Sequence, residues 1–236
     1  MKTKKAEKER LAFDNEFKEG FKLQDLIKHN WVLGKMIGRG GFGNVYLVFT
    51  DDPSLIDPEI KDFSAKIVFF LLKGTLSQRP AFLGNRILPT VTNWIKRKGL
   101  KFLGIPQHVT SGCEKNSAKP HRFIILPRLG QNVENIWLEM NKRFSPATCL
   151  QIGCRLLECL EYIHNFGYSH GDVKTSNLMT GYQDQLNFSR IYLMDFGLVS
   201  LFSTEKGHKP YKEDPKRKHD GTLEYTSCDA HDGVSK

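Results

Sequence analysis

The sequence lacks the features that would mark a secreted, zinc-bound or membrane-spanning protein. Its five cysteines are odd in number and include no CxxC pair, which argues against a disulfide framework or a zinc site. The longest apolar run, residues 67–72, has six residues and is too short to cross a membrane. The first 17 residues are charged with no apolar core behind them, so they form neither a signal peptide nor an anchor. We expect a nuclear or cytoplasmic protein with reduced thiols and no membrane contact.

Acidic side chains are also missing from one long stretch of the chain. Residues 63–113 contain no Asp or Glu but eight Lys and Arg residues, in a chain of formal net charge +9. Such a stretch can attract nucleic acid or acidic partners. Because charge alone is weak evidence for nucleic-acid binding, we favour a solvated basic face over direct nucleic-acid binding.

The size and composition are those of a globular protein. At 236 residues, the chain can bury a sizeable core as one domain or as two lobes sharing a cleft. Hydrophobic residues make up 39% and charged residues 26%, both ordinary values. No internal repeat or low-complexity tract interrupts the sequence.

The strongest motif is HGDVKTSN at residues 170–177, followed by Asp195-Phe196-Gly197. Asp172 can accept or orient the proton of an attacking hydroxyl, and Lys174 can lie against the charge of a transferring phosphoryl group. Asn177 and Asp195 offer hard oxygen ligands, the type that Mg²⁺ takes when it also coordinates phosphates. The motif therefore predicts phosphoryl transfer, with Asp172 and Lys174 as catalytic residues and Asn177 and Asp195 as metal ligands.

A glycine-rich segment lies between two predicted strands, residues 31–37 and 47–49. The β-branched and aromatic residues that follow it favour a strand-turn-strand flap over the start of a helix. Its glycines let backbone amides approach phosphates, and its valine can cover an adenine ring. Taken alone, the segment could equally be a structural hairpin. The predicted nucleotide-binding residues of this flap are Ile37, Gly38, Gly40, Gly41, Phe42, Gly43 and Val45.

A third predicted strand, residues 63–69, contains Lys66 as the only charge in an apolar run. Burying a lysine there costs free energy unless an anion meets it. We therefore favour a contact with the α and β phosphates of a nucleotide over an edge-strand surface lysine. Residues 122–126 predict a further strand that leads to a connector at 127–130, where we place Leu129 against the nucleotide.

A long helix is predicted from Pro146, with Ser145 as its cap, to the neighbourhood of Gly167. Leu150, Cys154, Leu157 and His164, with other apolar neighbours, indicate its core face. Cys154 and Cys159 fall in this pattern, so we expect packed and unreactive thiols there. A short amphipathic helix is predicted before it, at residues 132–142, and a long surface loop after it, at residues 198–224.

Together these motifs resemble a eukaryotic protein kinase, because they occur in the kinase order with workable spacing. Within that superfamily the sequence is similar to the vaccinia-related kinases, of the casein kinase 1 group. The matching stretches are IGRGGFGNVY, WIKRKGLKFLGIP, LECLEYIHNFGYSHGDVKTSNLM and YKEDPKRKHDGTLEYTSCDAHDGVS. The resemblance implies an α+β, two-lobed fold: a charged leader at 1–29, a β-rich N-lobe at 30–126 and an incomplete, mainly helical C-lobe at 127–236.

The resemblance also implies an activity. We expect a serine/threonine kinase that is a monomer, uses ATP and Mg²⁺, and acts on protein substrates, among them basic or chromatin-associated ones, in the nucleus. Gly171 stands where such kinases usually have an arginine. Because phosphorylation of the loop usually acts through new arginine–phosphate pairs, we expect activity not to require phosphorylation of residues 198–224.

Two departures from the kinase pattern leave an alternative open. The glutamate that should hold Lys66 has no counterpart, since Arg79 stands near its expected place and Pro80 disfavours helical geometry there. The chain also ends at Lys236, before the large helices that complete the C-lobe in this family, which predicts a C-terminally truncated kinase with part of its long helix uncovered. The alternative function is a catalytically weak or inactive kinase-like module that binds nucleotide or a partner protein.

Overall fold

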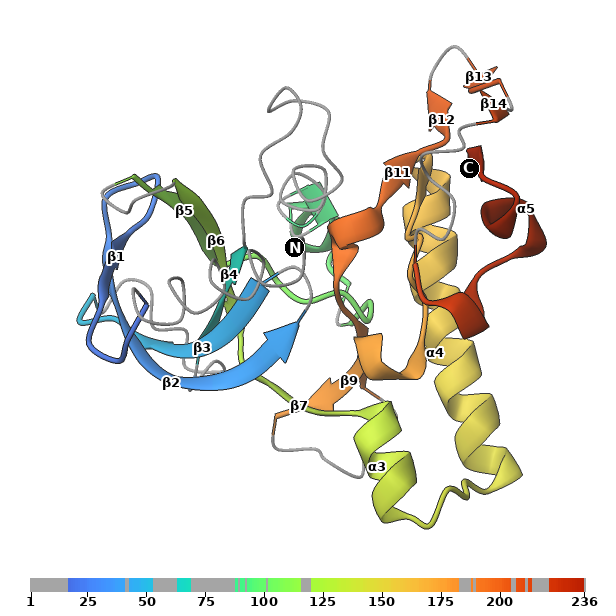
Figure 1. Ribbon diagram of the computed structural model, residues 1–236, viewed down its shortest axis with the longest axis horizontal. Coiled ribbons are helices and arrows are strands. Elements are labelled where there is room, and N and C mark those ends of the chain that lie inside the picture. The colour runs from blue at the N-terminus through green and yellow to red at the C-terminus, as the bar shows by residue number, and fades with distance from the viewer. Residues whose placement is uncertain are drawn as a thin grey trace, which may run out of the picture. The chain divides into compact units, whose positions relative to one another are not determined.

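The computed structural model forms two compact units, shown in Figure 1. The first comprises Met1–Lys73 and His108–Arg128, and the second comprises Gly74–Gln107 and Leu129–Lys236. The residues that the structure describes are 17–40, 43–52, 63–68, 88, 90, 91, 93–100, 102–115, 120–182, 188, 190–204, 207–210, 212, 213 and 221–235, with only the backbone described at 64–68, 212, 234 and 235.

The first unit is built on a six-stranded antiparallel sheet in the order β1-β2-β3-β4-β6-β5. Side chains along β3 and β5 alternate between buried and more exposed, as expected of a sheet with one face on a core. Trp31 packs edge to face on Phe63 at 5.5 Å in that core. The strands are β1 (Lys22–Gln24), β2 (Asn30–Gly40), β3 (Gly43–Phe49), β4 (Phe63–Val68), β5 (Thr110–Glu114) and β6 (His121–Pro127).

Within the predicted charged leader, residues 17–29 pack against this sheet, and Lys22–Gln24 form its strand β1. Phe17 is 2% exposed and packs on the rings of Phe21 and His121, at 5.0 and 5.1 Å. Leu23 and Asp25 are buried, and the Asp25 carboxylate accepts hydrogen bonds from Ile27 N, His29 N and Trp31 Nε1. The alternation of buried and exposed residues in β1 is a strand signal that the surrounding charges conceal.

The predicted strand-turn-strand flap is confirmed as the β2–β3 hairpin, in which Gly40 pairs with Gly43. Gly41 and Phe42 lie outside the described residues. Lys66 is on β4, where its backbone pairs with Val45 on one side and Ile124 on the other. Lys66 is therefore on an interior strand, and the edge-strand reading is wrong. The side chain of Lys66 lies outside the described part of the structure, and so do Arg79 and Pro80.

The described part of the second unit includes the helices α3 (Val133–Glu139), α4 (Pro146–Asn165) and α5 (Cys228–His231), and residues 88–98 are also helical where they are described. A three-stranded sheet has the order β10-β9-β7, with β7 (Leu129–Asn132), β9 (Leu178–Gly181) and β10 (Ile191–Leu193). No helix in the described part of the chain is long and apolar enough to cross a membrane.

Both predicted helix starts are confirmed by their caps. The Asn132 side chain accepts a hydrogen bond from Asn135 N at 2.7 Å and begins α3. The Ser145 hydroxyl accepts one from Thr148 N at 3.1 Å, and Pro146 follows in the first turn of α4. The N–H of Gly167 donates to His164 O at 2.8 Å, so α4 also ends where expected.

The predicted core face of α4 is wrong. Leu150 and Leu157 are 70% and 66% exposed, and Cys154 is exposed as well. The buried face consists instead of Ile152, Cys159, Tyr162 and Ile163. Burial raises the pKa of the Cys159 thiol to about 12, so the inert thiol expected there is confirmed. The helix has two apolar stripes, and periodicity alone does not say which of them packs.

The segment predicted as a long loop, residues 198–224, contains short strands. β11 (Ser200–Leu201) pairs with β8 (Tyr168–Ser169), β12 (Ser203–Thr204) pairs with β13 (Gly207–His208), and β14 (Lys212–Glu213) pairs with β15 (Val234–Ser235). The Ser169 and Ser200 hydroxyls also meet, at 2.9 Å. The described residues of the unit also form the 3₁₀ turns η2 (Thr175–Asn177), η3 (Phe196–Leu198) and η5 (Leu223–Tyr225).

Candidate active site

The β9–β10 hairpin brings two of the predicted site residues to one end. Asn177 immediately precedes β9, and Asp195 follows β10 after one residue. The strands are antiparallel, Leu178 pairs with Leu193, and Met194 N donates to Asn177 O at 2.8 Å. Asp195 has a left-handed backbone with φ 62°, a conformation that non-glycine residues adopt mostly under functional or local constraint.

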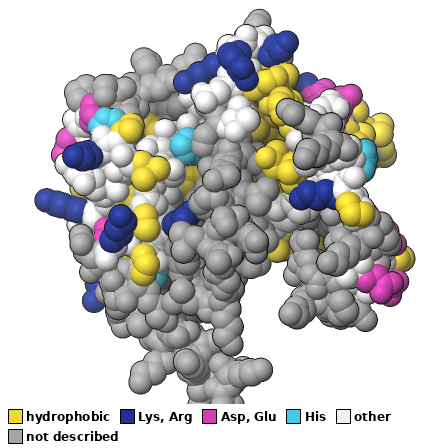
Figure 2. Space-filling view, turned by 90° about the horizontal axis from the view of Figure 1, so that it is seen from above, with side chains coloured by type: hydrophobic (Ala, Val, Ile, Leu, Met, Phe, Trp, Pro, Cys, Tyr) yellow, Lys and Arg dark blue, Asp and Glu magenta, His cyan; other side chains and the backbone are white. Residues whose placement is uncertain are grey.

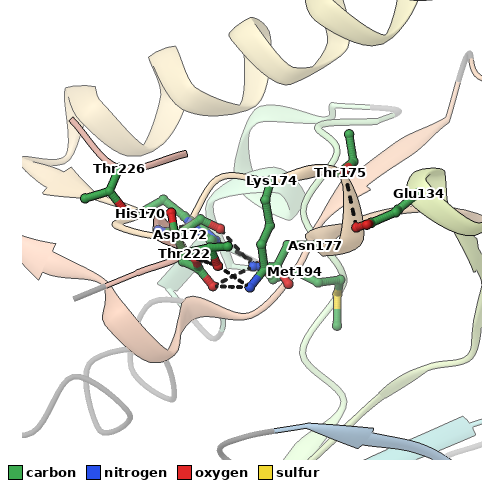
Figure 3. Close-up of polar contacts among 9 residues, drawn as sticks. All are labelled: Glu134, His170, Asp172, Lys174, Thr175, Asn177, Met194, Thr222 and Thr226. Atoms are coloured by element: carbon green, nitrogen blue, oxygen red, sulfur yellow. Dashed lines mark hydrogen bonds and ion pairs between the residues drawn. The ribbon is translucent and has the colours of Figure 1, made fainter. Parts of the chain in front are cut away.

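Asp172 is the centre of the site and is only 7% exposed (Figure 3). Its Oδ1 accepts a hydrogen bond from the Thr222 hydroxyl at 2.9 Å. Its Oδ2 lies 3.0 Å from Lys174 Nζ and accepts from Asn177 Nδ2 at 3.0 Å. The lysine also donates to Thr222 Oγ1 at 2.7 Å, so the side chains of Asp172, Lys174 and Thr222 form a closed ring of contacts. The structure thus brings together Asp172, Lys174 and Asn177.

Two opposing effects set the charge of Asp172. Burial by itself raises the pKa of the carboxyl, because the charged form loses hydration. Hydrogen bonds from Lys174 and Thr222, the positive charge of Lys174 and the hydrogen bond from Asn177 all favour the ionised form. These contacts outweigh burial, and the pKa of Asp172 lies below its usual value. The carboxylate is therefore ionised at neutral pH.

Two residues fix the backbone that presents Asp172. His170, which is buried, lies with Nε2 3.0 Å from Met194 O, and its Nδ1 accepts a hydrogen bond from Asp172 N at 3.3 Å. This arrangement assigns the ring proton to Nε2 and makes His170 a structural histidine, as predicted. Gly171 has φ 87°, and a Cβ there would lie 2.7 Å from Leu198 O. Only glycine fits this turn without strain.

Thr222 is the site residue that sequence reasoning missed. Its hydroxyl donates to a residue 50 positions earlier in the chain, and its own carbonyl accepts from Thr226 Oγ1 at 2.7 Å. The only available signal was its place in the stretch YKEDPKRKHDGTLEYTSCDAHDGVS, because neither spacing nor periodicity predicts a contact across that separation.

The predicted nucleotide-binding residues are distributed over both units. The first unit has Ile37, Gly38 and Gly40 at the end of β2, Gly43 and Val45 at the start of β3, and Lys66 on β4. Gly38 faces Val45, and an added Cβ would make an ordinary contact at 3.5 Å. Leu129 is the first residue of β7 in the second unit and is half-buried.

Comparison with known proteins identifies the class of fold. The protein kinase domain family matches residues 107–230. A solved structure of vaccinia related kinase 3 covers 92% of the chain with a TM-score of 0.73 and 26% sequence identity, and the match spans 63% of that structure's chain. The α+β, two-lobed protein-kinase fold predicted from the sequence is confirmed, and the chain matches part of the length of its relatives.

Curated relatives place the chain within that class. Human serine/threonine-protein kinase VRK2 is 39% identical over all of this chain, which spans 44% of VRK2. The probable serine/threonine-protein kinase FPV212 of fowlpox virus is 36% identical, over 92% of this chain and 68% of the relative. Nucleosomal histone kinase 1 of Drosophila melanogaster is 32% identical, over 99% of this chain and 37% of the relative. The chain belongs to the vaccinia-related kinase family.

Proposed function

We propose that the chain is a serine/threonine protein kinase that transfers the γ-phosphate of ATP to hydroxyl groups of proteins. The observation that carries this proposal is the ionised Asp172 carboxylate held between Thr222, Lys174 and Asn177. A carboxylate kept charged and rigid in a buried position can align a substrate hydroxyl. Family membership supplies the reaction class.

The chain's own residues account for the chemistry without a covalent step. The Asp172 carboxylate accepts the proton of the attacking hydroxyl, and its orientation is set by Thr222 and Asn177. Lys174 holds its positive charge beside that carboxylate, where it can stabilise the phosphoryl group in transfer. Positioning and electrostatic stabilisation are the main contributions in this type of reaction.

The site suits a magnesium ion by its donor chemistry. Asn177 Nδ2 donates to both the backbone oxygen and Oδ2 of Asp172, at 2.8 and 3.0 Å. Its Oδ1 accepts no hydrogen bond from the described residues, and this oxygen together with the Asp195 carboxylate makes a hard oxygen pair at one hairpin end. We assign Asn177 and Asp195 as the ligands of Mg²⁺, which when bound neutralises phosphate charge.

We assign the nucleotide to Lys66, Leu129 and the β2–β3 hairpin. The backbone pairing of Lys66 with Val45 supports a role for Lys66, because it places the lysine next to the glycine-rich hairpin. For the substrate, the Drosophila relative is named a nucleosomal histone kinase, and we extend to this chain protein substrates that include basic, chromatin-associated ones in the nucleus. We expect a monomer.

Phosphotransfer from Mg·ATP to a basic protein substrate tests the proposal. The wild-type chain should label the substrate, and Asp172→Ala and Lys66→Met should each reduce the rate by roughly 10²–10⁴-fold. If no chain labels the substrate while ATP still raises the Tm, the enzyme is rejected and the nucleotide-binding module is supported. The absence of Asp and Glu from residues 63–113 favours that alternative. Phosphoamino-acid analysis of the labelled substrate checks that serine and threonine are the acceptors.

A further inference from the structure

Glu134 has a contact that its position in a helix does not explain. It lies in the first turn of α3 and is half-buried. Acidic residues are common there because they complement the helix dipole and cap free amides. Here Asn132 already caps the helix, and the Glu134 side chain instead accepts a hydrogen bond from the Thr175 hydroxyl at 3.3 Å. The carboxylate is therefore held beside the loop that carries Asp172 (Figure 3).

Thr175 connects three segments of the second unit. It follows Lys174 directly, and its hydroxyl lies 3.2 Å from the Tyr225 hydroxyl as well as 3.3 Å from Glu134 Oε2. Since its single proton goes to Glu134, Tyr225 must donate to Thr175. The catalytic loop thus has a carboxylate on one neighbour, α3, and an aromatic hydroxyl on another, η5.

The two neighbours differ in chemistry. On η5, Leu223 and Tyr225 are 60% and 54% exposed, and Glu224 between them is also exposed, so its carboxylate is open to solvent rather than held beside the loop. Glu134 is a carboxylic acid side chain that, among the described residues, has no lysine, arginine or histidine within ion-pair distance. The chain has 35 Lys and Arg residues against 26 Asp and Glu, and Figure 2 shows lysine and arginine side chains at several places on one face of the molecule. A half-buried carboxylate without a cation is unusual on such a basic chain, and it suits a cation from outside.

We propose that Glu134 is a specificity-determining residue that binds an arginine or lysine side chain of the protein substrate close to the phosphoacceptor. The inference rests on the proposed function and names the substrate class of the same site. The Thr175 hydroxyl fixes one carboxylate oxygen, so little side-chain entropy remains to be lost on binding, and Oε1 stays available for a charge-assisted hydrogen bond. We expect the basic residue on the α3 side of the acceptor, because the Thr175 hydroxyl holds the Glu134 carboxylate in place, whereas Glu224 on η5 is exposed.

A peptide series tests this proposal. Each peptide has one serine flanked by alanines, and a single arginine is moved through the flanking positions. The wild-type chain should prefer arginine over alanine at one register by roughly tenfold in kcat/KM, expressed mainly in KM. In Glu134→Gln this ratio should fall to about one, and in Glu134→Arg the same register should prefer glutamate. Thr175→Val should weaken the arginine preference, because it removes the hydroxyl that fixes the carboxylate.

Glu139→Gln is the matched control, since Glu139 is an exposed glutamate at the other end of α3 whose carboxylate accepts a hydrogen bond from Gln131 Nε2 at 2.7 Å. Its arginine preference should equal that of the wild type. The proposal is overturned if the wild type shows no preferred register, if Glu134→Gln keeps the preference, or if it slows all peptides by the same factor. The last result would show that Glu134 only supports Thr175.

A binding measurement separates this inference from the proposed function. Fluorescence anisotropy of labelled arginine and alanine peptides needs no turnover. If the chain transfers no phosphate, tighter binding of the arginine peptide to wild type but not to Glu134→Gln would still support the role of Glu134, while the proposed function fails. Equal binding of both peptides to both chains would overturn the inference. Circular dichroism confirms that the variants are folded.

Discussion

The catalytic loop and the outer face of α4 belong to the same unit and have opposite compositions. In the loop, the polar side chains of His170, Asp172 and Asn177 are buried, and each has hydrogen-bond partners. On α4, the leucines at 150 and 157 face outward. Polar groups are inside in one region and apolar groups are outside in the other, which reverses the usual arrangement.

The difference shows where the order of the site comes from. A buried polar group is stable only when it is hydrogen-bonded, so the loop tolerates little change in its partners. Those partners come from the loop itself, the β9–β10 hairpin, α3 and residues 221–226, and none of the hydrogen bonds described above joins the loop to the outer face of α4. Substitutions in the loop should therefore affect stability and activity strongly, and substitutions on the outer face should affect both weakly.

Replacing one glycine in each region by alanine should change the free energy of unfolding in opposite directions. Gly171→Ala forces a Cβ towards Leu198 O at a φ of 87°, so we expect a loss of about 2 kcal/mol or more in the free energy of unfolding. In Gly153→Ala on α4, the added Cβ has no other atom within 4 Å. The free energy of unfolding should rise by about 0.5–1 kcal/mol, because alanine favours the helix. Chemical denaturation measures both values, and equal losses in the two variants would contradict the comparison.

Removing the Thr222 hydroxyl should reduce activity while leaving the fold intact. Thr222→Val keeps the shape of the side chain but removes the donor to Asp172 and the acceptor of Lys174. We expect kcat to fall roughly 10- to 100-fold, the worth of one charge-assisted hydrogen bond. Thr222→Ser retains the hydroxyl and should keep most of the activity. Equal rates in Thr222→Val and the wild type would mean that Thr222 does not position Asp172.

The lowered pKa of Asp172 should be visible in the dependence of stability on pH. Because the folded-state pKa lies below the unfolded value, the carboxylate stabilises the fold fully above the ordinary aspartate pKa of about 3.9 and loses this contribution as pH falls below it. The stability difference between wild type and Asp172→Asn should stay constant from about pH 7 to about pH 5 and shrink below about pH 4. Acid titration of unfolding measures it, and a difference that grows on acidification would have the wrong sign.

Local signals in the sequence were sufficient for the β2–β3 hairpin and for the starts of α3 and α4. The caps Asn132 and Ser145 and the Gly40–Gly43 hairpin depend on neighbours a few residues away, which the sequence displays directly. Thr222 was missed because its partner lies 50 residues earlier. The outer face of α4 was misassigned because two apolar stripes compete on one helix, and only tertiary packing against Trp94, whose ring lies 4.4 Å from Tyr162, decides between them.

The smallest effect is expected on the outer face of α4. Leu150→Gln and Leu157→Gln remove exposed apolar surface that contributes little to folding, so each should change the free energy of unfolding by less than about 0.5 kcal/mol. Ile163→Ala on the opposite, buried face of the same helix should cost about 2–5 kcal/mol. A large cost for the exposed leucines, or a lower sedimentation coefficient in the double variant, would show that another surface covers this face in solution. The reversal of inside and outside would then be confined to the catalytic loop, where hydrogen bonds maintain it.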